Sequence, residues 1–192
     1  PIEYLHQHKM SVVTQRELAT DTTSYDAALR AALREAPDVI LVGEMRDAET
    51  IRAAVTAAET GHLVISTLHT LGASNTIDRI VDSFPPEQQQ QIRTQLALVI
   101  EGVVSQQLVP AVDGSLIPAF EVMTVTPAVR NMIRESKAHQ LDNVISSSAA
   151  DGMISMDQSL LQLARAGRIG QDAALGHCIN SEWLRKRLAL NS

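Results

Sequence analysis

Residues 38–47 read Asp-Val-Ile-Leu-Val-Gly-Glu-Met-Arg-Asp, and residues 61–70 read Gly-His-Leu-Val-Ile-Ser-Thr-Leu-His-Thr. In each stretch a short apolar run, typical of a strand buried on both faces of a parallel sheet, precedes a polar side chain. Because α/β proteins bind ligands at the carboxyl ends of such strands, both polar groups would lie where a triphosphate can bind. The pair therefore predicts part of a nucleotide-driven motor. The phosphate-binding loop Gly-x-x-x-x-Gly-Lys-Ser/Thr does not occur in these 192 residues.

Helices and strands alternate around these two runs. Residues 10–14 are a further strand candidate, and a helix is expected from a cap at residues 22–24 to about residue 35. Asp47 can cap the next helix, which Gly61 closes. A third helix is expected over residues 73–84. A fourth follows Pro85-Pro86, and its inward residues would be Ile92, Leu96, Val99, Ile100 and Val103.

The pattern changes towards the end of the chain. Two apolar runs, residues 108–112 and 116–122, flank Asp113-Gly114 and predict a hairpin with a tight type I′ turn. After residue 125 only short helices are expected, with start signals at Thr126-Pro127 and Ser155-x-x-Gln158. We therefore predict a mostly parallel α/β domain with a hairpin in residues 1–125, followed by a small all-helical domain in residues 126–192.

Composition excludes several classes of function. The net charge is −6 and aromatic residues make up 3%, so the chain has neither a basic stripe nor a stacking platform for nucleic acid. The single cysteine, Cys178, cannot form an internal disulfide and fits a reducing, cytoplasmic setting. No apolar run approaches the ~20 residues of a membrane span. Because the sequence starts at Pro1 without Met, we expect it to be a fragment.

Glu44 and His69 are the candidate catalytic residues from this pattern. Glu44 at the end of a strand can polarise an attacking water or hold a magnesium-bound water. His69, after the next strand, can hydrogen-bond a γ-phosphate or that water. The alternatives are an acid that caps the next helix and a surface histidine. Two parallel neighbouring strands would bring both residues to one edge, which favours the catalytic interpretation.

Several arginines can stabilise phosphate charge. Arg30 and Arg34 are four residues apart on the first predicted helix, and Arg46 and Arg52 flank the second. Guanidinium groups stabilise the charge that develops on a transferring phosphoryl group. The alternative for each is a solvated helix face.

Four motifs together resemble one family. Pro1-Ile2-Glu3 with Gln15-Arg16-Glu17 resembles the tail of the Asp box of bacterial secretion ATPases. Residues 38–47 resemble their Walker B box and residues 61–70 their His box. Residues 128–135, Ala-Val-Arg-Asn-Met-Ile-Arg-Glu, resemble a motif of one branch, the type IV pilus retraction motors. The absence of a four-cysteine module agrees with that branch.

The resemblance implies a RecA-like P-loop ATPase domain whose C-terminal part, without the Walker A loop, is present here. It implies a homohexamer that binds ATP with Mg²⁺ at the cytoplasmic face of the inner membrane. The motor would power pilus retraction and twitching motility. Its partner would be an inner-membrane platform protein of the pilus machinery. Glu44, His69 and Glu3 would be catalytic, and Arg30, Arg34 and Arg46 would serve the nucleotide or the subunit interface. The chain alone is expected to be inactive.

The helix over residues 128–135 is expected to couple hydrolysis to movement. Arg130 and Arg134 share a face, with Glu135 beside them, and this face would meet a neighbouring subunit or the platform protein. Two other functions remain open. One is a pilus assembly or type II secretion ATPase that lacks the cysteine module. The other is a non-enzymatic regulatory or interaction subunit without a P-loop.

Overall fold

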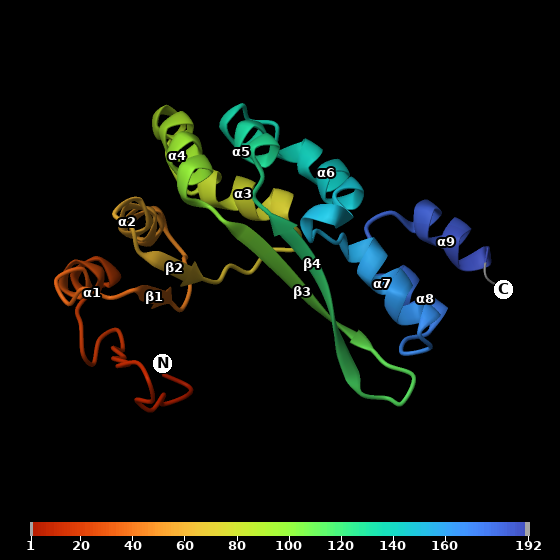
Figure 1. Cartoon of the computed structure of the whole chain (residues 1–192), viewed down its shortest axis with the longest axis horizontal. Helices are drawn as coiled ribbons and strands as arrows, with labels where there is room; N and C mark the ends of the chain where they lie inside the picture. Colours follow the sequence, from red (N-terminus) through yellow and green to blue (C-terminus); the bar gives the residue numbers. More distant parts are fainter. Residues whose placement is uncertain (1, 191–192) are drawn as a thin grey trace. The chain divides into compact units, whose positions relative to one another are not determined.

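The computed structural model describes residues 2–190 and separates into two compact units, Pro1–Leu68 and His69–Ser192 (Figure 1). Pro1, the first residue of the Asp-box stretch, lies outside the described residues. Among residues 2–190, no helix is both long and apolar enough to cross a membrane. The fold is mixed α/β, as predicted.

The first unit is built on two parallel strands. β1 (Val39–Val42) pairs with β2 (Leu63–Ser66) in parallel, with Val39 opposite Leu63 and Val42 opposite Ser66. Helices α1 (Tyr25–Ala32) and α2 (Ala48–Glu59) supply the packing partners. One small cluster of this unit consists of Leu29, Ile40, Val42 and Ala57, and α2 also buries Ile51, Ala54 and Val55.

The two strands are covered on one face only, and this corrects the prediction of strands buried on both faces. Ile40 and Val42 are buried, whereas Leu41 is 67% exposed and Ile65 is 48% exposed. Successive side chains of a strand point to opposite faces, and the buried core of the unit, with Leu29 of α1 and Ala57 of α2, lies on the Ile40 side. An unbroken apolar run thus leaves half of its side chains exposed within this unit.

The segment before α1 forms a closed loop in place of the predicted strand at residues 10–14. Gln15 closes it, since its Nε2 donates to the carbonyl of Tyr4 at 2.9 Å and its Oε1 accepts the N–H of His6 at 2.8 Å. Arg16 then pairs with Glu35, beyond the end of α1. No described strand pairs with residues 10–14, and the N–H of Val13 donates instead to Nδ1 of His8 at 3.0 Å.

Helix boundaries follow the capping signals. Ser24 caps α1 and Asp47 caps α2, the latter by accepting the N–H of Thr50 at 2.8 Å. Gly61 follows α2 with φ +97°, a left-handed conformation that favours glycine. Helix α1 ends at Ala32, three residues before the predicted end.

The second unit surrounds a long hairpin of β3 (Gly102–Pro110) and β4 (Leu116–Thr124). It begins with α3 (Ala73–Asp82) and α4 (Pro86–Val99). After the hairpin come five helices and two short 3₁₀ turns among the described residues: α5 (Pro127–Arg134), η1 (Ala138–Gln140), α6 (Leu141–Ser147), η2 (Ala149–Asp151), α7 (Met156–Arg165), α8 (Gln171–His177) and α9 (Ser181–Ala189).

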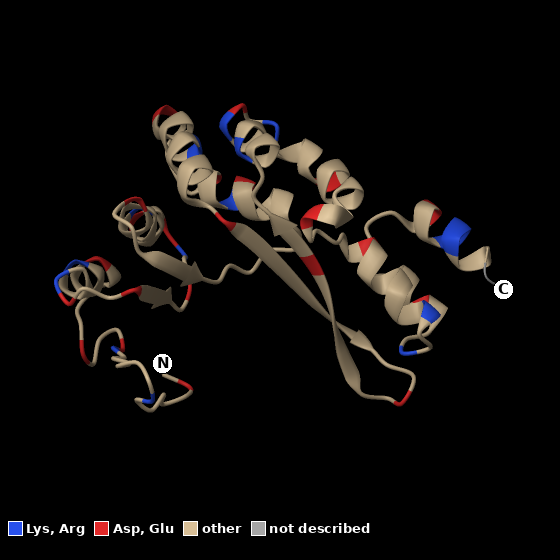
Figure 2. Ribbon diagram, in the orientation of Figure 1, with Lys and Arg blue, Asp and Glu red and all other residues tan. Residues whose placement is uncertain are grey.

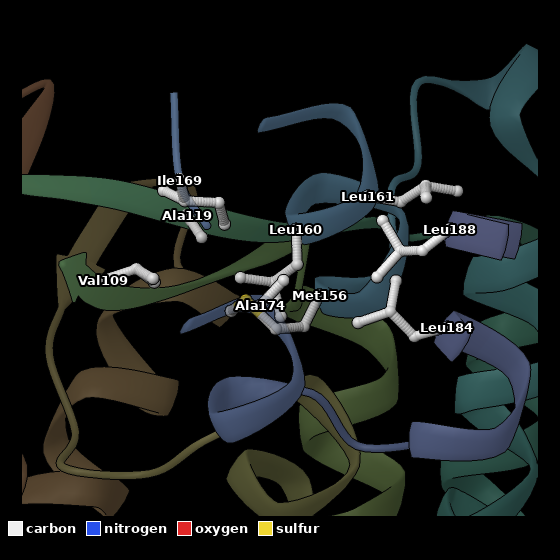
Figure 3. Packing of buried hydrophobic residues seen from close by; sticks show 9 residues of the cluster. All are labelled: Val109, Ala119, Met156, Leu160, Leu161, Ile169, Ala174, Leu184 and Leu188. Atoms are coloured by element: carbon white, nitrogen blue, oxygen red, sulfur yellow. The ribbon is translucent and has the colours of Figure 1, made fainter. Parts of the chain in front are cut away.

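One face of the hairpin carries a cluster of nine buried apolar residues. Val109 and Ala119 pack against α7, α8 and α9, with Leu160 and Leu184 among the fully buried side chains (Figure 3). Thr126 caps α5 and Pro127 is its first residue, as predicted. The predicted Ser155–Gln158 capping box of α7 is also present. Gly167 ends α7 with φ +66°.

Two details of this unit differ from the prediction. Helix α4 ends at Val99, so Val103 lies in β3 and not on an inward helix face. The hairpin loop is longer than a type I′ turn, because Ala111 N–H bonds to the carbonyl of Ser115 at 2.8 Å and leaves three residues between them. Gly114 takes φ +83° there, as the left-handed residue of a three-residue loop does.

The helices after residue 125 pack on the hairpin that precedes them. Val122 and Ile154 exchange backbone hydrogen bonds at 2.9 and 3.0 Å, and the N–H of Phe120 donates to Ser159 Oγ at 3.1 Å. The division of the chain at residue 125 stays a prediction.

Candidate functional site

The carboxyl ends of β1 and β2 are joined beyond the last sheet pair. The N–H of Met45 donates to the carbonyl of Thr67 at 3.1 Å, and Thr67 Oγ1 donates to the carbonyl of Gly43 at 2.5 Å. These two bonds fix the backbone on either side of Glu44. The backbone that carries the predicted catalytic carboxylate is therefore fixed by hydrogen bonds within the first unit.

Glu44 is partly buried, with 21% of its side chain exposed, and forms an ion pair with Arg46. Arg46 Nε lies 2.8 Å from Glu44 Oε2, and this hydrogen bond raises the pKa of Arg46 above its ordinary value. The guanidinium group itself is 77% exposed. The structure therefore brings two of the predicted site residues together at the end of β1.

A buried hydroxyl lies at the same strand end. Ser66 is the last residue of β2 and stands opposite Val42 in the register, and its Oγ is buried with no hydrogen-bond partner. A buried hydroxyl without a partner is costly, so Ser66 Oγ is an unsatisfied polar group at this strand end. This edge fits part of a nucleotide site, but it lacks the backbone nest that would bind the β-phosphate. Among residues 2–190, no group of three or more His, Cys, Asp or Glu side chains could hold a metal ion.

His69 is the first residue of the second unit, and it is exposed. The loop that it begins is fastened to α3. Thr70 Oγ1 and Thr76 Oγ1 are 2.8 Å apart, and Asn75 Nδ2 donates to the carbonyl of Leu71 at 2.8 Å. The loop ends at Gly72, with φ +84°.

The other N-terminal candidates lie on the surface of the first unit. Arg30 forms an i,i+4 ion pair with Asp26 at 2.8 Å and is 79% exposed, and Arg34 and Glu3 are also exposed. Exposed ion pairs of this kind contribute about 0–1 kcal/mol to stability. Figure 2 shows both basic and acidic residues on α1. Their positions leave them accessible to a ligand or to another protein.

The predicted coupling residues differ in their surroundings. Arg130 donates from Nη1 to the carbonyls of Ala97 and Leu98, at 2.8 and 3.0 Å, and from Nη2 to Glu101 at 2.9 Å. It therefore caps the C-terminus of α4. Arg134 is exposed and bonds within its own helix to Asn131.

Glu135, the third of these residues, is exposed and pairs with Lys137 at 2.7 Å, which lowers the pKa of Glu135. The sequence places Arg130 and Arg134 on one face, but only the side chain of Arg130 bonds to α4, whereas Arg134 accepts a bond from Gln90 of α4 with its backbone carbonyl.

Glu121 was missed by the sequence analysis. It is 2% exposed, in the middle of β4, and accepts hydrogen bonds from the backbone of α3 and α7. The signal was present, because a single acid stands inside the otherwise apolar run from Leu116 to Met123. A charged group in a buried strand requires partners, and here these partners are two helix N-termini.

Comparison with known proteins identifies relatives for most of the chain. Residues 1–143 match the model of the type II/IV secretion system protein family. A twitching motility protein of Neisseria gonorrhoeae is 51% identical over 95% of this chain and 49% of its own length. The type IV pilus retraction ATPase PilT of Pseudomonas aeruginosa is 49% identical over 91% of this chain and 51% of its own length.

The fold also matches a solved structure. A crystal structure of the pilus retraction motor PilT with bound ADP superposes with a TM-score of 0.88 at 46% sequence identity. The match covers 97% of this chain and 52% of that chain. The chain thus spans about half the length of the relatives it matches.

Proposed function

The chain belongs to the type II/IV secretion system protein family, and from that premise we propose that it is part of an ATP-hydrolysing motor that retracts type IV pili. The observation that carries the proposal is Glu44 on a fixed backbone at the carboxyl end of β1. Relatives at about half sequence identity are a twitching motility protein and a pilus retraction ATPase. ATP is the proposed substrate.

The proposed chemistry assigns the activation of water to Glu44. Its carboxylate, on a backbone that the bonds of Met45 and Thr67 fix, would accept a proton from a water that attacks the γ-phosphate. Mg²⁺ bound with the nucleotide would neutralise phosphate charge, and Glu44 would hold it through a water.

The remaining candidates keep the roles that the family resemblance implies. His69 would hydrogen-bond the γ-phosphate or the attacking water, and Glu3 would be the last acid of the Asp box. Arg30, Arg34 and Arg46 would stabilise phosphate charge or meet a neighbouring subunit. Arg46 would have to leave Glu44 to do so, because the two side chains are paired in this structure.

The whole motor is proposed to be a homohexamer at the cytoplasmic face of the inner membrane, with the pilus platform protein as partner. Arg134 and Glu135 are exposed on and just after α5 and are the better candidates for that contact. Arg130 bonds to the end of α4 and would hold α5 in position.

The test uses a hybrid protein in which this chain replaces the matching half of the Pseudomonas aeruginosa retraction ATPase. The wild-type hybrid should hydrolyse ATP. Glu44→Gln should retain ATP binding and lower turnover by about 10²–10⁴-fold, the usual loss on removal of a general base. Glu49→Gln, an exposed acid in the first turn of α2, is the matched control and should keep its turnover. Turnover of Glu44→Gln close to that of the control would refute the catalytic role.

The isolated chain should bind magnesium-ATP weakly or not at all. These 192 residues lack the Gly-x-x-x-x-Gly-Lys-Ser/Thr loop, whose backbone N–H groups supply most phosphate contacts in such sites. Calorimetric titration of the chain beside the hybrid protein measures the difference. Equal affinities would show that the chain binds nucleotide without that loop.

A further inference from the structure

Glu121 joins two helix N-termini that are far apart in the sequence. Its Oε1 accepts the N–H of Ala73 at 2.9 Å, and its Oε2 accepts the N–H of Met156 at 3.4 Å. Ala73 is the first residue of α3 and Met156 is the first residue of α7. Both oxygens of one carboxylate are therefore used to fasten separate helices to β4.

Helix α3 depends on this carboxylate because it has no cap of its own. Its N-cap residue is Gly72, which has no side chain and stands at φ +84°. A Cβ at residue 72 would lie 3.6 Å from Glu121 Oε1, so the carboxylate occupies the place of a capping side chain. A carboxylate is well suited there, since helix N-termini carry partial positive charge.

The same bond fixes the end of the loop that begins with His69. Residues 70–72 are tied to α3 by the Thr70–Thr76 and Asn75–Leu71 bonds. Glu121 ties α3 in turn to β4. The position of this loop is thus set by a residue that lies 52 positions further along the chain than His69.

A purely structural carboxylate would be an expensive choice at this position. Burial raises the pKa of Glu121, and the acids Asp142 and Asp157 raise it further, against the lowering effect of the two N–H donors. Replacement of buried charged groups by apolar residues is often neutral or stabilising. A role beyond stability therefore explains the presence of a buried carboxylate at residue 121 better than packing does.

We propose that Glu121 is a positioning residue that links the loop starting at His69 to the N-terminus of α7. Through this link, a displacement of the C-terminal helices changes the position of the loop, and a displacement of the loop moves the helices. The assignment of that loop to ATP turnover rests on the function proposed above.

The link itself is tested on the 192-residue chain by amide hydrogen exchange. Glu121→Ala should accelerate exchange at Ala73 and at Met156 by about 10- to 100-fold, and Glu121→Gln should do so less, because its carbonyl oxygen can still accept one bond. Asp157→Asn is the control for the Ala73 readout, since this buried acid accepts the N–H groups of Ile179 and Asn180 and none from α3. Unchanged exchange at Ala73 in Glu121→Ala would overturn the link.

The effect on turnover is tested in the hybrid protein. Glu121→Gln should lower kcat by at least about tenfold, the size expected when a catalytic loop is misplaced, with little change in KM. Asp157→Asn should keep both parameters, and melting temperatures of the two variants should agree. A kcat of Glu121→Gln equal to that of Asp157→Asn would overturn the positioning role.

A further variant separates this proposal from the proposed function. If His69→Ala lowers turnover and Glu121→Gln does not, the motor assignment stands and the role of Glu121 is refuted. If the wild-type hybrid hydrolyses no ATP, the proposed function is refuted and the role of Glu121 in turnover falls with it. The exchange measurements on the chain then decide alone whether Glu121 links α3 to α7.

Discussion

The two units bury their strands to different depths. In the first unit, the cluster against the strands has four buried residues, and both strands have only four residues each. In the second, nine-residue strands pack on helices around a cluster of nine buried residues. The proposed catalytic Glu44 is thus in the unit with the smaller core, whereas the helices of the proposed coupling part belong to the larger one. Regions with few buried contacts open most readily, so we expect the first unit to exchange its amides faster.

The largest effect should come from the core of the second unit. Leu160→Ala removes a fully buried side chain beside Val109 and Ala119 and should destabilise the unit by about 2–5 kcal/mol. Urea denaturation followed by the fluorescence of Trp183, the single tryptophan, measures this unit directly. Leu116→Ala, at a position that is 62% exposed, is the control and should cost much less. Equal losses of stability in the two variants would contradict the packing of Leu160 in the cluster with Val109 and Ala119.

A smaller loss is expected from Arg130→Ala. The substitution removes two bonds to the last carbonyls of α4 and one to Glu101, and it should cost about 1–2 kcal/mol. Arg134→Ala removes an exposed side chain from the same helix and should change stability by less than about 0.5 kcal/mol. The same Trp183 measurement compares both variants. Similar values would mean that Arg130 does not hold α5 to α4.

In the first unit, Asp47→Ala should cost about 1 kcal/mol at pH 7, the usual value of an N-cap. The bond from the Thr50 N–H lowers the pKa of Asp47, so the folded state favours the ionised form. This contribution is complete above the unfolded pKa of ~3.9 and is lost as the pH falls through the folded pKa. Hydrogen exchange of α2 amides at pH 7 and at low pH measures it. Asp47→Asn, which caps without titrating, should lose no stability from this group on acidification.

The smallest effect should come from the exposed face of β1. Leu41→Ser replaces a side chain that is 67% exposed and should change the stability of the first unit by about 0.5 kcal/mol or less. Exchange of the β1 and β2 amides in the 192-residue chain provides the measurement. A large loss would show that this face is covered in solution, and the contrast between the two units would then be wrong.

Local signals predicted most of the elements. Asp47, Thr126 and Ser155 begin helices because their side chains accept backbone N–H groups nearby, an interaction that sequence spacing reveals. The parallel strands were also visible, since their apolar runs end at Gly43 and at Thr67. These interactions connect residues a few positions apart and need no knowledge of the rest of the fold.

Interactions between distant residues were not predictable in the same way. Glu121 meets the N–H of Ala73, 48 positions away, and Arg130 meets the carbonyl of Ala97, 33 positions away. Nothing in the local spacing distinguishes Arg130 from Arg134. For the same reason, the run from Val39 to Val42 predicts a buried strand but not which of its faces this unit covers.

The closed loop in front of α1 has a practical consequence for labelling the protein. Gln15 holds Tyr4 and His6 in place, while Met10 at the far end is fully exposed. The entropy cost of closing a flexible loop grows only logarithmically with its length, by about 0.6 kcal/mol per doubling. A short peptide tag inserted next to Met10 would therefore lengthen the loop at little cost, and the amide of Gln15 would keep its two ends together.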